Sequence, residues 1–248
     1  MKANQLQVNK IHLNIGGVSI LNDISFSLSE GERIGLVGPN GAGKTSVINC
    51  ITQFEKRYKG EITFANKLLN KENPQDLPKY KIIRTFQNLG LFNELTVLDN
   101  FYIAAHQSFE TNLKNLFTLE KNIKKEAQKL LENETIDLND MISDLSYGQQ
   151  KIVEFLCALI QRPSVLILDE PAAGLNDFEK SRMIEMILMK QQELNFSLLV
   201  VEHDVNFVST LCQNVVVLQS GELLCTGCPE EVFQKKEVIQ AWIGESNV

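Results

Sequence analysis

The chain has 248 residues, 44% of them hydrophobic, and a formal net charge of -7. This length is enough for one α/β domain with a full core, and the acidity argues against a protein that acts mainly on nucleic acid or an anionic membrane face. Its apolar runs are strand-sized, far below the roughly 18 to 20 residues that a membrane-spanning helix needs, and no signal peptide opens it. We therefore expect a cytoplasmic protein that reaches a membrane only through a partner.

The five cysteines are scattered through apolar segments, which is typical of small buried side chains in a reducing compartment. Cys225 and Cys228 form a lone C-x-x-C pair. Without a second pair or a neighbouring histidine, this spacing favours a β-turn over a zinc or redox site.

The N-terminal region alternates apolar and polar residues, which predicts antiparallel strands with one buried face. Glycines at 16–17 and 31 supply the turns, and residues 60–64 are expected to form one further strand of this group. The alternating apolar positions are Leu6, Val8, Ile11, Leu13, Ile15, Ile24, Phe26 and Leu28.

Residues 38–45 fit the pattern G-x-x-x-x-G-K-[ST], a loop whose backbone N–H groups wrap a polyphosphate. An apolar strand at 34–37 precedes it and a helical segment at 46–51 follows it, which is the context that the motif requires. Its glycines permit close approach to phosphates, and the helix start offers unpaired N–H groups. A glycine-rich turn without a ligand is the alternative, but it gives no reason for Lys-Thr at this spacing. The loop and the residue after it are Gly38, Pro39, Asn40, Gly41, Ala42, Gly43, Lys44, Thr45 and Ser46.

The pattern changes after this first α/β part. Residues 66–79 are polar with two prolines, and between 95 and 142 apolar residues recur three or four apart, with lysines and glutamates on the other faces. We expect a helical insertion at about 88–160 whose charges are solvated. Ser146 and Gln149 have the spacing of a capping box at the start of its last, amphipathic helix, and such a helix start can bind an anion.

Strands return at 165–168, an uninterrupted apolar run typical of a parallel strand buried on both faces. This run ends in Asp169 and Glu170, whose desolvation is costly unless a cation or a proton transfer uses them. A helix near 183–188 and a strand at 197–201 come next.

His203 follows that last strand. Because ligands of parallel sheets bind beyond the carboxyl ends of the strands, we expect Gly38, Asp169 and His203 to lie at one edge. After this point we expect three short β segments with turns, and then a helix opened by Pro229.

Together these features resemble the ATP-binding cassette ATPases along essentially the whole chain. Leu-Ser-Tyr-Gly-Gln at 145–149 is similar to the family's signature sequence, and Ala-Gly-Leu-Asn at 173–176 is similar to its D-loop. Arg-Thr-Phe-Gln at 84–87, the Tyr-Gly-Gln-Gln form of the signature and Trp-Ile-Gly at 242–244 resemble the importers of branched-chain amino acids. The urea and short-amide importers share much of this pattern.

The resemblance implies one cassette domain over residues 1–248. Its fold would be an α/β P-loop NTPase core with a mostly parallel sheet, an antiparallel β subdomain and the helical subdomain inserted at about 88–160. The implied cofactors are ATP and Mg²⁺.

The resemblance also implies catalytic roles. Lys44 would contact the β- and γ-phosphates, and Thr45 with Asp169 would hold Mg²⁺. Glu170 would orient or deprotonate the attacking water, as a general base.

Two further catalytic roles are implied at loop positions. His203 would contact the γ-phosphate, the alternative being a polar strand terminus. Gln87 would join the metal, the water and the surface of the membrane partner, the alternative being a solvated loop residue.

Other implied contacts involve the nucleotide and a second cassette. Ser146, Gly148 and Gln149 would bind the γ-phosphate held by a partner cassette that faces this one head to tail. Ile15 stands where the family usually places an aromatic residue against adenine, so aliphatic contact would replace stacking there. Asn176 replaces the common aspartate of the D-loop, or serves simply as a helix N-cap.

The implied partners are a second cassette, identical or related, and transmembrane permease subunits at the inner face of the cell membrane. A solute-binding protein would act indirectly, and no nucleic acid partner is expected. A soluble cassette ATPase that works in DNA repair or translation is the alternative, although such proteins usually carry two cassettes or a long coiled-coil insertion. A small-molecule kinase with the same phosphate loop is a third reading, against which the signature-like stretch argues.

Overall fold

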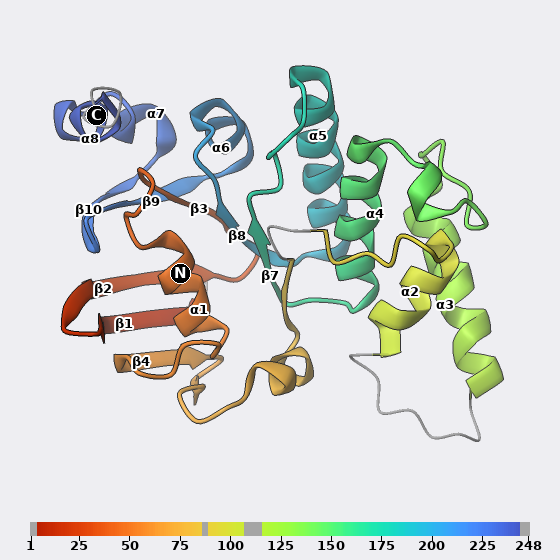
Figure 1. The fold of residues 1–248 in the computed structure, drawn as a ribbon, viewed down its shortest axis with the longest axis horizontal. Helices are drawn as coiled ribbons and strands as arrows, with labels where there is room; N and C mark the ends of the chain where they lie inside the picture. The colour runs from red at the N-terminus through yellow and green to blue at the C-terminus, as the bar shows by residue number, and fades with distance from the viewer. Residues whose placement is uncertain (1–3, 86–88, 107–115, 244–248) are drawn as a thin grey trace.

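A computed structural model describes residues 4–85, 89–106 and 116–243 of the chain, and it contains two sheets (Figure 1). The four-stranded sheet is antiparallel, in the order β2-β1-β4-β5, and the six-stranded sheet has the order β10-β9-β3-β8-β7-β6. Strands β9, β3, β8, β7 and β6 run parallel, and β10 pairs antiparallel with β9. This arrangement confirms the predicted α/β fold class.

The strands lie where the apolar alternation and the apolar runs predict them. The antiparallel sheet consists of β1 (Asn4–Ile15), β2 (Val18–Ser29), β4 (Lys59–Phe64) and β5 (Lys67–Leu68). The six-stranded sheet consists of β3 (Arg33–Val37), β6 (Ile82–Arg84), β7 (Val165–Asp169), β8 (Ser197–Val201), β9 (Asn214–Gln219) and β10 (Glu222–Gly227).

Helices pack along the six-stranded sheet, and α2, α3 and α4 form a separate group at one end of the molecule. In Figure 1, α2, α3 and α4 lie together, on the side away from β1, β2 and β4. The α-helices are α1 (Lys44–Ile51), α2 (Val97–His106), α3 (Leu116–Leu130), α4 (Tyr147–Ile160), α5 (Asp177–Leu194), α6 (Val205–Leu211), α7 (Pro229–Val232) and α8 (Lys236–Ile243). Short 3₁₀ segments are η1 (Pro74–Tyr80) and η3 (Ile142–Asp144). None of the helices within the described ranges is long and apolar enough to cross a bilayer.

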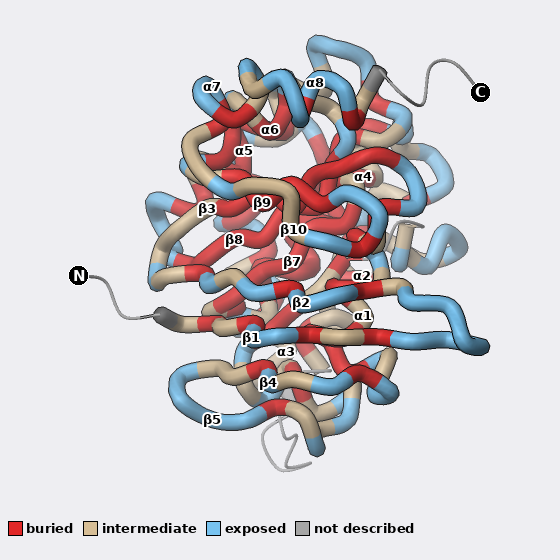
Figure 2. Tube along the Cα trace, turned by 90° about the vertical axis from the view of Figure 1, so that its left-hand side faces the viewer, coloured by how far each residue is buried: buried red, intermediate tan, exposed pale blue. Residues whose placement is uncertain are grey.

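Every residue of the central strands β7 and β8 is buried, and these strands are red in Figure 2. Alternate residues of β7 divide between two apolar clusters. Val165 and Ile167 pack into the cluster that contains α1 and the antiparallel sheet, while Leu166 and Leu168 pack into the cluster that contains α4 and α5. Side chains of a strand point alternately to opposite faces, so an unbroken apolar run is what a doubly covered strand requires.

The segment after His203 differs from the prediction of three β segments. It begins with a helix, α6, and only two strands follow, β9 and β10. Asp204 starts the helix, because its side chain accepts a hydrogen bond of 3.0 Å from the N–H of Phe207. Phe207, Val208 and Leu211 are buried on one side of the helix. The few apolar residues of this short segment fit the period of a strand as well as that of a helix, so the pattern alone does not distinguish the two.

The C-x-x-C pair does not form the predicted β-turn. Cys225 lies within β10, whose pairing with β9 extends to Gly227, and Cys228 is the N-cap residue of α7. Both thiols are free, and no group of three or more potential metal ligands occurs among the residues that the structure describes. Burial of the interior cysteines is as predicted, and it raises the pKa of the Cys50 thiol to about 12.

Candidate functional site

The loop between β3 and α1 lies at the carboxyl end of the parallel strands, and glycines shape it. Gly38, Gly41 and Gly43 have φ values of 152°, 75° and 100°, where glycine is favoured. A Cβ on Gly38 would lie 2.2 Å from the carbonyl oxygen of Leu218, whereas a Cβ on Gly41 would meet no atom within 4 Å. The loop is therefore packed against the sheet on one side and open on the other.

A positive charge is held at this loop. Lys44 is 8% exposed, and its Nζ donates hydrogen bonds to the carbonyl oxygens of Gly38 (2.6 Å) and Pro39 (2.9 Å). Thr45, the next residue of α1, is exposed. An ammonium group, a hydroxyl group and the N–H groups of a helix start are thus gathered at one loop, which is the donor set that a polyphosphate needs.

Asp169 ends β7 and is paired with an arginine that the sequence analysis did not assign to the site. The carboxylate oxygen Oδ2 of Asp169 accepts a hydrogen bond of 2.8 Å from Nη2 of Arg84, and both side chains are less than one-tenth exposed. Nη1 of Arg84 donates to Asn49 Oδ1 (2.8 Å) and Thr52 Oγ1 (3.2 Å) of the helix α1 segment. Arg84 therefore links β6, β7 and the end of α1. The signal in the sequence is the buried carboxylate itself, because Asp169 at the end of an apolar strand requires a nearby cation, and Arg84 provides it.

Glu170 and His203 follow β7 and β8, and a buried carboxylate joins the two loops. The N–H of Glu170 donates to the carbonyl oxygen of Val201 (2.9 Å), and Glu170 itself has a φ of 51°. Glu202 is fully buried, and it accepts hydrogen bonds from the N–H groups of Ala172 (2.7 Å) and His203 (3.1 Å). Burial raises the pKa of the Glu202 carboxyl. The side chain of His203 is 59% exposed, so it stands free of the core beside the strand ends.

The signature-like residues lie at the start of α4, where the predicted capping box is confirmed. Ser146 Oγ accepts a hydrogen bond from the N–H of Gln149 (3.3 Å), and Gln149 Oε1 accepts one from the N–H of Ser146 (2.9 Å). Gly148 is buried between them. Asn176 caps α5 in the same way, with Glu179 as the reciprocal partner, which agrees with the N-cap interpretation of that residue.

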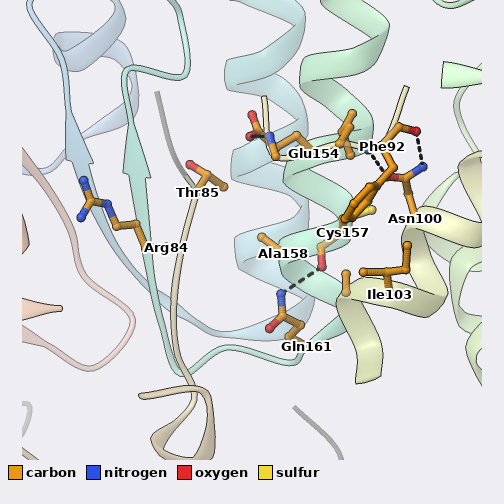
Figure 3. A pocket seen from close by; sticks show the side chains of 12 residues that line it. Arg84, Thr85, Phe92, Asn100, Ile103, Glu154, Cys157, Ala158 and Gln161 are labelled. Atoms are coloured by element: carbon orange, nitrogen blue, oxygen red, sulfur yellow. Dashed lines mark hydrogen bonds between the residues drawn. The ribbon is translucent and has the colours of Figure 1, made fainter. Parts of the chain in front are cut away.

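Gln87 lies outside the described residues, but the chain on both sides of it borders a hollow of about 210 Å³ (Figure 3). Thr85 comes from the end of β6, and α2 and α4 form the other walls. Glu154 of α4 accepts a hydrogen bond from the N–H of Gly90 (3.0 Å) and pairs with Lys151 (3.7 Å). Burial raises the pKa of the Glu154 carboxyl.

Ile15 ends β1 at the tip of the β1–β2 hairpin, and 38% of it is exposed. Val18, across the turn, is 61% exposed. The same hairpin reaches the phosphate loop, because Leu21 Cδ2 lies 2.7 Å from the position of a Cβ on Gly43. The hairpin therefore offers an aliphatic surface near the loop.

The structure divides the predicted residues between two places. The loop at 38–45, Glu170 and His203 come just after β3, β7 and β8, which are adjacent in the sheet, and Asp169 is the last residue of β7. Ser146, Gly148 and Gln149 instead line a hollow of about 220 Å³ together with residues of the D-loop and α5. That hollow belongs to a different part of the surface from the one that residues 39–42 line with Gln219 and Ser220.

The residues at the strand ends fit a magnesium nucleotide. Hydroxyl and carboxylate oxygens, as Thr45 and Asp169 offer, are the ligands that Mg²⁺ prefers, and this ion usually takes its other ligands from phosphates and water. The open space beside Gly41 leaves room for those phosphates. When bound, Mg²⁺ would offset charge on the terminal phosphates.

We predict that Arg84→Met lowers the free energy of unfolding by about 3–5 kcal/mol, because Asp169 is left buried without its counter-charge. Urea unfolding without nucleotide at neutral pH measures the change. Arg84→Met combined with Asp169→Asn should recover part of the loss.

The matched control is Arg162→Met, which breaks an ion pair with Glu126 in which the arginine side chain is 66% exposed and the glutamate side chain 30% exposed. An exposed pair contributes roughly 0–1 kcal/mol, so this variant should unfold almost as the parent does. Equal losses in the two arginine variants would contradict the importance given to the buried pair.

Comparisons with known proteins agree with this geometry. The profile of the family described as ABC transporter matches residues 21–173. The chain is 35% identical over 250 residues to the high-affinity branched-chain amino acid transport ATP-binding protein LivG of Salmonella typhimurium, covering 97% of this chain and 98% of that protein. It is 36% identical over 255 residues to BraF of Pseudomonas aeruginosa, a protein with the same description and the same coverage.

Solved structures give the same result. The chain is similar to the ADP conformation of MJ1267, an ATP-binding cassette of an ABC transporter, with a TM-score of 0.87, 28% identity and coverage of 98% of this chain and 100% of that one. It is also similar to cbiO1 of Clostridium perfringens, part of the ABC transporter complex cbiONQ, with a TM-score of 0.82, 30% identity and coverage of 96% and 94%. A family profile over most of the chain and relatives that span nearly all of it establish that this protein belongs to the ABC transporter family, as one of its ATP-binding cassette ATPases.

Proposed function

We propose that this chain is the ATP-hydrolysing subunit of an importer for branched-chain amino acids or a related amino-acid or urea-type solute. The observation that carries the proposal is the full-length similarity to LivG and BraF, the ATP-binding proteins of branched-chain amino acid transport. The site at the strand ends supports the ATPase part of the proposal independently.

In the proposed site, each residue acts from its place at the sheet edge. Lys44 and the loop N–H groups hold the β- and γ-phosphates, and Thr45 and Asp169 hold Mg²⁺. Glu170, one residue beyond the metal ligand, orients or deprotonates the attacking water, a role worth on the order of 10²- to 10⁴-fold in rate. His203 contacts the γ-phosphate from the end of β8, where its exposed ring is available.

The signature residues complete a site in a second cassette. Ser146, Gly148 and Gln149 lie at a helix start, which favours an anion, but they line a hollow away from this chain's own phosphate loop. We therefore assign them the γ-phosphate of ATP held by a partner cassette, identical or related, that faces this one head to tail.

The hollow in Figure 3 is where we place the permease contact. Thr85 and Gly90, which precede and follow Gln87 in the sequence, line it, and Arg84 at its edge is paired with Asp169. Movement of a permease segment in this hollow would thus reach the proposed metal ligand Asp169 through one ion pair. We assign Gln87, a further proposed metal ligand, the role of joining the metal and the attacking water to the surface of the permease. The cassette would sit on the inner face of the membrane through permease subunits, with a solute-binding protein acting indirectly.

The division of the domain follows from the same arrangement. Strands β6 and β7 are neighbours in the parallel sheet, although α2, α3 and α4 lie between them in sequence. We propose that residues 88–160 form a helical subdomain inserted in an otherwise continuous α/β core. It carries the signature residues, so its orientation would set the distance between the two halves of the shared site.

We predict that Glu170→Gln keeps ATP binding but stops turnover, because the amide cannot accept the proton of the attacking water. ATP-bound dimers should accumulate, visible by size-exclusion chromatography with ATP and absent with ADP. Glu185→Gln, on the solvent side of α5, is the control and should hydrolyse ATP as the parent does. Turnover at the parental rate in Glu170→Gln would refute the role given to this carboxylate.

We predict that Ile15→Phe strengthens ATP binding, since an aromatic ring can stack on the base where isoleucine offers only aliphatic contact. An aromatic contact is worth roughly 0.5–1.5 kcal/mol beyond buried area, which corresponds to roughly two- to tenfold in Kd. Calorimetric titration with ATP in the Glu170→Gln background measures it. Ile15→Leu should leave the Kd unchanged, and an unchanged Kd in Ile15→Phe would place the adenine elsewhere.

The importer assignment predicts that the tagged chain is extracted from its native membrane together with multi-span proteins. Detergent extraction and mass spectrometry of the purified complex test this. Uptake of radiolabelled leucine, compared with labelled urea, should fall in cells that carry Glu170→Gln. Recovery of the chain without any multi-span protein would favour the soluble cassette ATPase instead.

A further inference from the structure

The aromatic ring of Tyr147 packs against Gly174, in the space that a larger side chain at Gly174 would occupy. We define the signature segment as residues 145–149 and the D-loop segment as residues 173–176. Gly174 has a φ of 78°, and a Cβ on it would lie 2.8 Å from Cε1 of Tyr147, 3.4 Å from its Cζ and 3.5 Å from its Cδ1. The edge of the tyrosine ring therefore lies directly against the D-loop backbone.

A second glycine makes the contact reciprocal. A Cβ on Gly148 would lie 2.6 Å from Oε1 of Glu179, in the first turn of α5. Glu179 is restrained, since its Oε2 accepts a hydrogen bond of 3.0 Å from the N–H of Asn176 in the capping box. Gly174 of the D-loop segment thus packs against Tyr147 of the signature segment, and Gly148 of the signature segment packs against Glu179, which is hydrogen-bonded to the D-loop segment. The starts of α4 and α5 are therefore in close contact at two points.

The tyrosine ring is also restrained on the side of α4. Nζ of Lys151 lies 5.9 Å from the centroid of the Tyr147 ring, within the range of a cation–π contact. Lys151 is 2% exposed and pairs with Glu154, so its own position is fixed by the core. The ring consequently contacts both α4 and the D-loop segment in a fixed position, although 44% of Tyr147 is exposed.

Gly174 of the D-loop segment lies four positions after Glu170, the proposed catalytic carboxylate. Two tight turns join them, because the N–H of Ala173 donates to the carbonyl oxygen of Glu170 (3.2 Å) and the N–H of Leu175 donates to that of Ala172 (3.2 Å). Ala172 is further tied to the buried Glu202. A displacement of Gly174 is therefore transmitted to Glu170 instead of being absorbed by a loose loop.

We infer that Tyr147 is a positioning residue that holds the D-loop segment, and with it Glu170, in register with the signature segment of the same chain. Engagement of the partner's γ-phosphate by the signature segment would then set the geometry of Glu170 in this chain's own site. The inference rests on the proposed function, because it requires two cassettes that share their nucleotides.

A double-mutant cycle tests the contact. Gly174→Ala adds a strained backbone conformation and a clash with the ring, and only the clash is relieved when Tyr147→Ala is added. We expect each single variant to lower kcat by roughly tenfold and the double variant to lose no more than the worse single one, a coupling of roughly tenfold. The KM for ATP should change little, because the phosphate loop is intact, and Tyr147→Phe should restore most of the turnover that Tyr147→Ala loses.

Two further readouts separate positioning from folding and from the proposed function. Urea unfolding and ADP binding identify any variant that fails to fold. If Tyr147→Ala does not fold, the same cycle is measured with Tyr147→Leu in its place. Rate losses that multiply in the double variant would overturn the inference alone, provided that Glu170→Gln still forms ATP-dependent dimers. Failure of Glu170→Gln to dimerise with ATP would overturn the shared site and the inference together.

Discussion

Backbone hydrogen bonds between β3, β8 and β7 fix which residues meet at the functional edge of the sheet. Val201 is the register partner of both Leu36 and Asp169, so the three strands end within a residue or two of each other. The phosphate loop, Glu170 and His203 then begin where the ladder stops. A shift of one residue in the pairing of β7 with β8 would turn alternate side chains of β7 to the opposite face and remove Asp169 from the edge. Strand register therefore determines the geometry of the proposed catalytic site before any loop does.

This register has a desolvation cost, because it places charged side chains in buried positions. Lys44, Arg84, Asp169 and Glu202 are largely buried at the edge, and each is compensated differently. Lys44 is held by backbone carbonyl groups, while the arginine and the aspartate neutralise one another. Glu202 takes two backbone N–H groups and has its pKa raised by burial. Since a nucleotide and its metal would replace part of this compensation, the edge is prepared for a charged ligand by groups that already hold one another in place.

The features that could be predicted from the sequence are those with local physical causes. The phosphate loop, the capping box at Ser146 and the unbroken run that forms β7 each follow from residues within a short window. The pairing of Arg84 with Asp169 joins residues 85 positions apart, so no window contains it. The contact of Tyr147 with Gly174 joins residues 27 positions apart, on two different helix starts, so it too lies outside any short window. Helix α6 was missed for another reason, because its few apolar residues fit either period.

The separation of the two half-sites explains why a single cassette has an incomplete catalytic unit in the proposed mechanism. The N–H groups at the start of a helix lack intrahelical acceptors, and the capping box of α4 satisfies those of Ser146 and Gln149. The helix start still presents its positive dipole end to an anion. A nucleotide on the phosphate loop of the same chain would not be in contact with this helix start, since the two line different hollows. In the proposed mechanism, a nucleotide held by another cassette provides the anion at this helix start. Because ATP would then bind the closed pair better than the open one, its hydrolysis would reverse the preference, and the cycle would need no energy source beyond that difference in affinity.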